Sequence, residues 1–492
     1  MNAALLVITS FLVLAVVLAI LARRGRKMSL EQWALGGRGL GTIMVFLLMA
    51  GEAFSTFTFL GASGWAYSKG APTFYILAYG PVGFVLAFWM LPAVWRYATA
   101  HKLVSFSDFF AHKYQSRALS VVVSVVALAG MVALLTIQLR GLGIIVAQAS
   151  YGSIAPSVSI WIGVVVMVGY LLFSGIHGSA SIAVVKDLLV LGLALFLGIY
   201  LPWHYYGGIT PMFQAIHAEN PDYFSFPKEG LNLTWYNSTV LLTALGYYLY
   251  PFNLTSVFTA KSAQAVRRNT ILMPLYTIVI ALLFMVGFAA MLKVPGLKGA
   301  DVDLALFGLA KFTFDPWFVG VIGGAGVLTA LVPGSMILLT ASTIIGKNVY
   351  KEGFAPQATD RQVARAARIA LPLFALVGVY FVLRGGSTIV SVAIFASSLL
   401  TQLLPSLLFS LLPRPFGSKQ AAIAGILTGG FVVGLGTLGG VSLAQLFPHA
   451  STMVKSINIG LIALAANAIV FTVVALAGPR AWRRAELVSA AA

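Results

Sequence analysis

Cysteine is absent from this 492-residue chain, and charged residues are scarce at 9%. Without cysteine, disulfide bonds, thiolate chemistry and zinc ribbons are excluded. A soluble domain typically carries about 25% charged residues, so this chain has no room for a separate soluble domain. Instead, 60% of its residues are hydrophobic and the mean hydropathy is +0.95. This composition predicts an all-α polytopic membrane protein.

Sequence signatures of enzymes and metal sites are also missing. We find no P-loop, no nucleophile elbow and no paired catalytic carboxylates, so a membrane enzyme has no catalytic residues to support it. No organic cofactor is expected. The six histidines are scattered over loops and helix ends without metal-binding spacing: His101, His112, His177, His204, His217 and His449.

Acidic residues are few, with 13 Asp+Glu against 31 Lys+Arg and a net charge of +18. Nucleic-acid binding could explain such a charge, but most of the basic residues lie in short loops on one side of the apolar stretches. This asymmetry is the positive-inside rule. It predicts an integral membrane protein with the N-terminus outside and the C-terminus cytoplasmic. Lipid is then an expected partner, and nucleic acid is not.

Thirteen apolar stretches are long enough to cross a bilayer as helices. In the first, positive charge follows the apolar run, so we expect a retained span and not a cleaved signal. The predicted spans are 3–22, 41–67, 74–95, 118–147, 156–174, 181–203, 235–258, 270–292, 316–346, 366–383, 387–412, 418–440 and 456–477.

The second and seventh spans are predicted to be broken helices. The second contains Gly51, a polar group, and then Gly61 and Gly64, while the seventh contains Pro251. A proline removes a backbone hydrogen bond, and free backbone at membrane depth is tolerated only where it lines a cavity. The alternative is that glycine and proline are simply common in membrane helices.

Five spans separate the starts of these two segments, which is the spacing of two inverted five-helix repeats. We therefore predict a single transmembrane domain, 1–492, with a core of repeat one (41–203) and repeat two (235–412). The accessory helices are 3–22 and those within 418–477.

Glu52 is the strongest single candidate for a functional residue. It lies inside the apolar stretch 41–67, where a carboxylate costs about 3 kcal/mol even on the insertion scales. We expect it to face a cavity and to bind a cation or carry a proton. The alternative is a structural glutamate held by an arginine or by freed backbone N–H groups.

Arg140 lies in the fourth span, about two turns from its outer end. Its guanidinium offers two parallel donors to a carboxylate. It would hold a substrate carboxylate or pair with Glu52, unless it reaches the outer headgroups. Gln138 lies two residues away, on a different helix face, and is less expected to share this role.

Aromatic and small polar residues surround the two breaks. They would wall a substrate site, although aromatic packing or an interfacial belt is the alternative. The candidates for substrate binding are Ser55, Thr56, Tyr247, Tyr250, Phe252 and Asn253, beside Arg140.

The order of several short motifs resembles the sodium:solute symporter family, and the later ones are closest to bacterial monocarboxylate permeases. The resemblance covers nearly the whole chain. The motifs that support the resemblance are Leu60-Gly61-Ala62-Ser63-Gly64-Trp65-Ala66-Tyr67, Gln138-Leu139-Arg140-Gly141, Val184-Val185-Lys186-Asp187, Leu249-Tyr250-Pro251, Ala260-Lys261-Ser262 and Asn348-Val349-Tyr350-Lys351.

The resemblance implies alternating access and a Na⁺ site made by carbonyls of the second span and two hydroxyls of the ninth. The carbonyls carry over to Gly51 and Phe54, but the hydroxyl pair falls on Val332 and Pro333, which offer no side-chain oxygen. This departure leaves the coupling ion open between Na⁺ and H⁺. The nearby hydroxyls that would substitute are those of Thr329 and Ser335.

Asp187, beside Lys186, matches an aspartate that the family is thought to use for inward release of the ion. The alternative, which we favour, is a carboxylate in the first turn of a helix, stabilised by the helix dipole.

Together these features predict a secondary active symporter that takes up a small organic solute, with a monocarboxylate as the expected substrate. A passive channel or a facilitator and exchanger for small organic acids on the same scaffold is the alternative.

Overall fold

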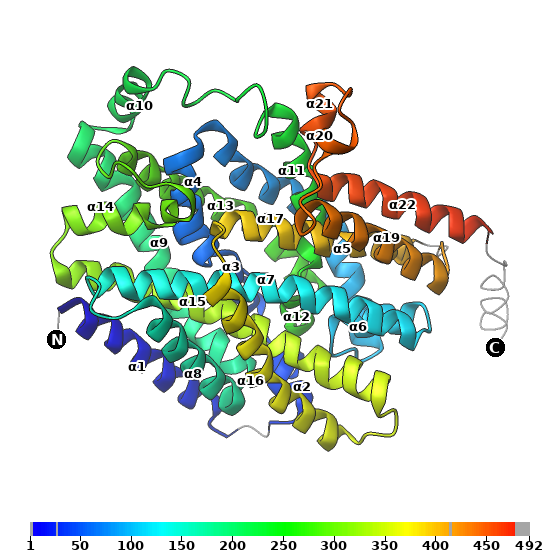
Figure 1. Ribbon diagram of the computed structural model, residues 1–492. Coiled ribbons are helices and arrows are strands. Elements are labelled where there is room, and N and C mark those ends of the chain that lie inside the picture. Colours follow the sequence, from blue (N-terminus) through cyan, green and yellow to red (C-terminus); the bar gives the residue numbers. More distant parts are fainter. Residues whose placement is uncertain (1–2, 26–27, 413–415, 478–492) are drawn as a thin grey trace.

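The computed structural model describes residues 3–25, 28–412 and 416–477 (Figure 1). Over these ranges the chain is almost entirely helical, and β-structure is confined to one isolated pairing of Leu40 with Ala260. The side chains of Glu52 and Tyr276 and the tail from residue 478 lie outside the described part. The predicted all-α architecture is confirmed.

Eleven helices in the described residues are long and apolar enough to cross a membrane. Each coincides with a predicted span, and the remaining two predicted spans are the broken ones, so the total of thirteen stays a prediction. The helices are α1 Ala3–Arg23, α5 Tyr75–Ala100, α7 Arg117–Ala149, α8 Pro156–Ser174, α9 Ile176–Tyr206, α13 Ala263–Met291, α15 Pro316–Ile344, α16 Asp360–Arg384, α17 Ile389–Leu400 with α18 Leu404–Leu411, α19 Lys419–Thr437 and α22 Ile459–Ala477.

The first break separates α3 Thr42–Ala53 from a π-helical turn, Phe57–Gly61, which leads into α4 Ala62–Lys69. Phe54 leaves the helical region with φ −88° and ψ 74°. Side chains replace some of the lost backbone bonds: the Thr58 hydroxyl donates to the Ala53 carbonyl oxygen at 2.8 Å. Such local replacement makes an interrupted helix tolerable at membrane depth.

The second break separates α11 Leu233–Gly246 from α12 Pro251–Thr259, with one 3₁₀ turn between them. Pro251 is the first residue of α12, and Tyr250 before it is extended, with φ −65° and ψ 120°. Proline disfavours the helical conformation in the residue before it. Both predicted breaks are therefore present, and the local sequence accounts for the second.

Two opposite ends of the bundle, named here for their short helices, frame the core (Figure 1). The α10 face carries α10 Ile209–Glu219, the 3₁₀ segment Gly299–Leu304 and α14 Ala305–Thr313. The α2 face carries α2 Leu30–Leu35, α6 Phe106–Lys113 and the π-helical segment Ile345–Phe354. Helix α9 starts beside α2 and leads into α10. The remaining short helices are Gly36–Arg38, Ala71–Phe74, Thr401–Leu403 between α17 and α18, α20 Leu443–Leu446 and α21 Thr452–Lys455.

Helix α15 lies at the centre of the bundle. Its residues are buried almost without interruption from Gly320 to Ile344, which is why its sequence is apolar on every face. Glycine permits close approach here, since a Cβ at Gly320 would lie 2.7 Å from the Cα of Ala4. Helix α15 therefore provides the fixed wall against which the two breaks are placed.

Candidate functional site

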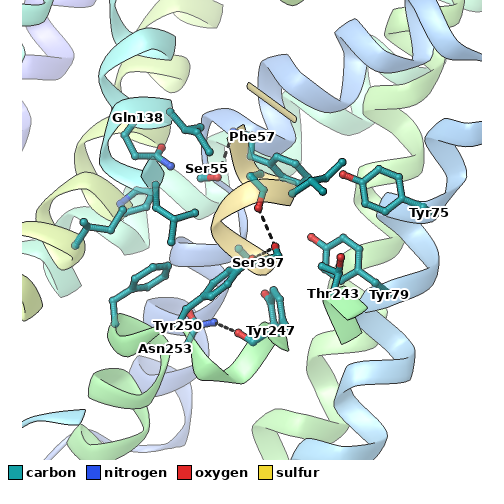
Figure 2. A pocket seen from close by; sticks show the side chains of 18 residues that line it. Ser55, Phe57, Tyr75, Tyr79, Gln138, Thr243, Tyr247, Tyr250, Asn253 and Ser397 are labelled. Carbon is teal, nitrogen blue, oxygen red and sulfur yellow. Dashed lines mark hydrogen bonds between the residues drawn. The ribbon is translucent and has the colours of Figure 1, made fainter. Parts of the chain in front are cut away.

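A cavity of about 60 Å³ lies between the two helix breaks (Figure 2). Its walls come from the first break, α5, α7, the second break, α15 and α17. Figure 2 shows Ser55 and Gln138 on one side, Tyr75 and Tyr79 on the other, and Tyr247, Tyr250 and Asn253 below. The predicted substrate residues that line it are Ser55, Tyr247, Tyr250, Phe252 and Asn253.

Hydrogen bonds fix the second break around this cavity. The Asn253 side-chain amide donates to the Tyr247 carbonyl oxygen at 2.8 Å, which satisfies a carbonyl beside the unwound turn. The Tyr250 hydroxyl and the Ser397 hydroxyl share a hydrogen bond of 2.6 Å, linking the break to α17. The aromatic rings are therefore held in place by polar contacts as well as by packing.

Gln138, which was less expected than Arg140 to hold a substrate, lines the cavity. Its Oε1 accepts from the Thr56 hydroxyl at 3.0 Å and from the Thr56 N–H at 3.3 Å. Thr56 itself is not among the lining residues; its hydroxyl also contacts the Ile137 carbonyl oxygen at 3.1 Å. Thr56 thus positions Gln138, and with Oε1 engaged the amide NH₂ points into the cavity (Figure 2).

Neutral hydrogen-bond donors line the cavity. Among the described residues no charged side chain is part of the lining. The Thr243 hydroxyl is buried and has no hydrogen-bond partner among these residues, a state that costs about 1–3 kcal/mol. A ligand that accepts hydrogen bonds would remove this cost.

The sequence reasoning missed Gln138, Thr243, Tyr75 and Tyr79 as lining residues. Of these four, only Gln138 had a pattern in the sequence that could indicate its position. It has the spacing of one helix face with Leu134 and Ile137, which also line the cavity. Tyr75 and Tyr79 reach the cavity through the packing of α5, which no local pattern reports.

The predicted cation site at the first break holds the side chain of Lys186. Its ammonium donates to the carbonyl oxygens of Gly51 at 2.6 Å and Phe54 at 2.9 Å. It also forms an ion pair with Asp187 Oδ1 at 2.9 Å. Lys186 is fully buried, with 0% of its side chain exposed, so this cation is a permanent part of the core.

The hydroxyls that were expected to complete a Na⁺ shell are engaged elsewhere. The Thr329 hydroxyl donates to the Gly326 carbonyl oxygen at 2.6 Å, and the Ser335 hydroxyl donates to that of Val332 at 2.6 Å. Ser335 also shares a hydrogen bond of 2.7 Å with the Ser179 hydroxyl. With the carbonyls of the break bound to an ammonium, the residues present do not fit a sodium ion.

Our preferred reading of Asp187 as a first-turn carboxylate is wrong. Helix α9 begins at Ile176, five residues before the predicted start of 181, and Asp187 lies about three turns inside it. The helix dipole acts only near the ends of a helix. The partner of Asp187 is the ammonium of Lys186 instead.

Arg140 pairs with Asp303 and is not among the cavity-lining residues. Its Nε lies 3.3 Å from Asp303 Oδ2, and its Nη2 donates to the Ala300 carbonyl oxygen at 3.1 Å. Asp303 Oδ2 also accepts from the N–H of Ile389, the first residue of α17, at 3.1 Å. The pair therefore ties α7, the segment 299–304 and α17 together beside the α10 face.

Burial raises the pKa of Asp303 to about 6, although Arg140 and the Ile389 N–H oppose the shift. Between pH 3.8 and about 6, Asp303 therefore keeps a proton in the folded protein, whereas in the unfolded chain, where its pKa is near 3.8, it releases that proton. This stabilisation is complete below pH 3.8 and is lost as the pH rises through about 6. At 1.36 kcal/mol per pKa unit, it is on the order of 3 kcal/mol.

We expect Asp303→Asn to remove the part of the pH dependence of thermal stability that lies between pH 4 and 6. The matched control is Asp301→Asn, because Asp301 is exposed and on the same segment. Thermal unfolding of the purified protein from pH 4 to 7.5 gives the comparison. If the profiles of the wild type and Asp303→Asn have the same shape, Asp303 does not titrate in this range.

On the α2 face, Asp108 is the hub of a buried polar cluster. Its Oδ2 accepts from the N–H groups of Val104 at 2.8 Å and Ser105 at 3.0 Å and pairs with Lys347, and its Oδ1 accepts from Asn348 at 2.8 Å. Burial alone would raise the pKa of Asp108, but Lys347 and these hydrogen bonds together lower it. The cluster joins α6 to the π-helical segment Ile345–Phe354, which follows α15.

The broken helices, the central cavity and the cation position can be compared with known proteins. The sequence model of the sodium:solute symporter family matches residues 33–429, a range that contains all three features. The chain belongs to the sodium:solute symporter family. The expectation drawn from its motifs is confirmed, and the protein is a membrane-embedded symporter of a small solute.

Relatives within the family support this assignment. The chain is 51% identical to an uncharacterized symporter, YhjB, of Bacillus subtilis (strain 168), over 97% of both chains. It is 28% identical to a monocarboxylate transport permease protein of Rhizobium johnstonii, over 87% of both chains. A Na⁺-coupled sialic acid symporter, solved in a substrate-bound outward-open state, matches with a TM-score of 0.79 over 97% of this chain and 98% of that one. At 15% identity, this last match shows the fold alone.

Proposed function

We propose that this symporter takes up a small monocarboxylate together with a cation, by alternating access to the cavity between the two breaks. The observation that carries the proposal is the cavity itself: two interrupted helices meet there, with neutral donors and aromatic walls. Sites at the meeting of discontinuous helices are where secondary transporters bind their solutes. The Rhizobium relative, named as a monocarboxylate permease, supports the substrate class.

A carboxylate suits this lining because it only accepts hydrogen bonds. The Gln138 NH₂ and the unpartnered Thr243 hydroxyl would each donate to one of its oxygens, and Tyr79 adds a phenol. The small volume and the aromatic walls favour a short apolar remainder. Arg140 is left out of this proposal because Asp303 already holds it; we assign it to closure of the α10 face.

The remaining features of the proposal come from the sequence. Repeats 41–203 and 235–412 would rock against each other, with the α10 face outside and the C-terminus cytoplasmic in a bacterial plasma membrane. Glu52 lies on α3 next to Gly51, and its role as a proton or cation carrier stays a prediction because its side chain is not described.

Uptake into proteoliposomes tests the proposal. Labelled acetate, pyruvate and lactate would be offered with a proton gradient, a sodium gradient or neither, and the matching amides would serve as controls. We expect accumulation of at least one acid above its outside concentration, driven by an imposed cation gradient, and no accumulation of the amides. Equal handling of acids and amides would reject the monocarboxylate assignment.

A facilitator or exchanger for small organic acids is the second candidate. The observation that favours it is Lys186, because a cation that belongs to the chain cannot be carried across the membrane with the solute. Exchange of labelled for unlabelled acid without accumulation under either gradient would identify this activity.

A further inference from the structure

We infer that Lys186 is a built-in cation that replaces a sodium ion at the break of the first core helix, so that transport by this protein does not require Na⁺. The inference rests on the proposed uptake of a solute through the same break. It concerns the identity of the ion, which the family assignment leaves open.

The ammonium of Lys186 satisfies the oxygens that the break exposes. It donates to two carbonyl oxygens, those of Gly51 and Phe54, and it forms an ion pair with the carboxylate of Asp187. These are hard oxygen ligands of the kind that also bind metal cations. Lys186 therefore makes the contacts that a bound ion would make, and Asp187 balances its charge.

Described side chains crowd the Cα of Gly51. A Cβ built on Gly51 would lie 3.5 Å from Nζ of Lys186, 3.5 Å from a methyl of Val332 and 3.3 Å from the Cβ of Ala183. Two apolar side chains and one ammonium thus lie against Gly51. A sodium ion there would also face Lys186 at short range in a medium of low dielectric constant, where like charges repel strongly.

The wall contributed by α15 agrees with this assignment. Val332 has no side-chain oxygen, and the nearby hydroxyls of Thr329 and Ser335 donate to carbonyls of their own helix. The ammonium is held without any oxygen from α15, whereas a sodium ion would need further oxygen ligands. The missing hydroxyl pair and the buried lysine thus have one explanation: the lysine ammonium takes the place of a sodium ion, so the hydroxyl ligands of that ion are not needed.

The break also explains how a fixed cation can serve the substrate. Phe54 holds Lys186 through its carbonyl, and Ser55, the next residue, lines the cavity. Two consecutive residues of the break thus connect the Lys186 ammonium to the cavity wall.

Ion binding without any substrate gives the first test. Thermal unfolding of the purified protein is measured in NaCl and in choline chloride at equal ionic strength. We expect no difference for the wild type, because a ligand stabilises only if it binds the folded state. Lys186→Ala vacates the site and leaves Gly51, Phe54 and Asp187 as ligands, so we expect its Tm to rise with Na⁺ concentration. Lys186→Met fills the same space without charge and is the matched control, with no Na⁺ effect.

Uptake gives the second test, in proteoliposomes with the acid that the wild type transports. We expect the wild-type rate to stay within twofold when choline replaces Na⁺. Lys186→Ala should lose at least tenfold in choline and regain activity in Na⁺, and Lys186→Met should lose activity in both.

Either of two results overturns the inference: stabilisation or acceleration of the wild type by Na⁺, or full activity of Lys186→Ala in choline. If both variants fail to fold, the Na⁺ titration of the wild type still decides. If the wild type transports no monocarboxylate, the proposed substrate fails, but the unfolding experiment still shows whether the site binds Na⁺.

Discussion

Replacing Gln138 by leucine should raise the KM for the transported acid about 10–100-fold, because a hydrogen bond to a charged group is worth about 1.5–3 kcal/mol. The NH₂ of Gln138 is directed into the cavity, and leucine removes this donor while keeping a similar volume. The change also leaves the Thr56 N–H and hydroxyl without the acceptor Oε1. Initial uptake rates over a range of substrate concentrations measure the effect.

Gln148→Leu is the matched control for this experiment. Gln148 lies on the same helix, α7, but accepts from Lys311 at 2.6 Å and is not among the cavity-lining residues. Its replacement should leave the KM unchanged. Thr56→Val should give an intermediate loss, because it loosens Gln138 without removing it. Equal KM values for Gln138→Leu and Gln148→Leu would show that Gln138 does not contact the substrate.

Replacing Asp108 by alanine should destabilise the folded protein by about 3 kcal/mol, the lower part of the range for breaking a buried ion pair. Asp108 is 4% exposed. It accepts hydrogen bonds from two backbone N–H groups and from the side chains of Lys347 and Asn348. Removing it leaves these buried donors unsatisfied, while Lys347 is 25% exposed and keeps some contact with solvent. Thermal or denaturant unfolding of the purified protein measures the loss.

The Asp108 carboxylate should also affect how the stability of the folded protein changes at low pH. Because the folded pKa of Asp108 is lowered from 3.8, its stabilising contribution is present above that value and is lost as the pH falls through the lower, folded pKa. Asp108→Ala should therefore be less sensitive to acid below about pH 4 than the wild type. Asp360→Ala is the control, since the Asp360 side chain is 98% exposed and its pairing with Lys351 is expected to contribute little. Equal losses for both variants would contradict a structural role for the cluster.

The membrane-helix architecture could be read from the sequence because its signals are local. Apolar length identifies spans, and Pro251 fixes the second break through its missing N–H and its effect on Tyr250. The five aromatic and polar residues predicted at the breaks that line the cavity were found for the same reason: a broken membrane helix has to face a cavity. The loss of the hydroxyl pair of the family's Na⁺ site was also visible in the sequence, because Val332 and Pro333 have no side-chain oxygen.

Long-range partners could not be read from the sequence, because they depend on how helices distant in the chain pack together. Arg140 was predicted to meet a carboxylate, but nothing near it in the sequence points to Asp303, 163 residues away. Lys186 lies in the predicted span 181–203, and nothing local placed it at the break; the packing of α9 against α3 brings it there. Composition and local pattern thus determined that this chain spans a membrane and where its helices break. The tertiary structure determined which charge occupies the break, because only packing brings Lys186 to the carbonyls of Gly51 and Phe54.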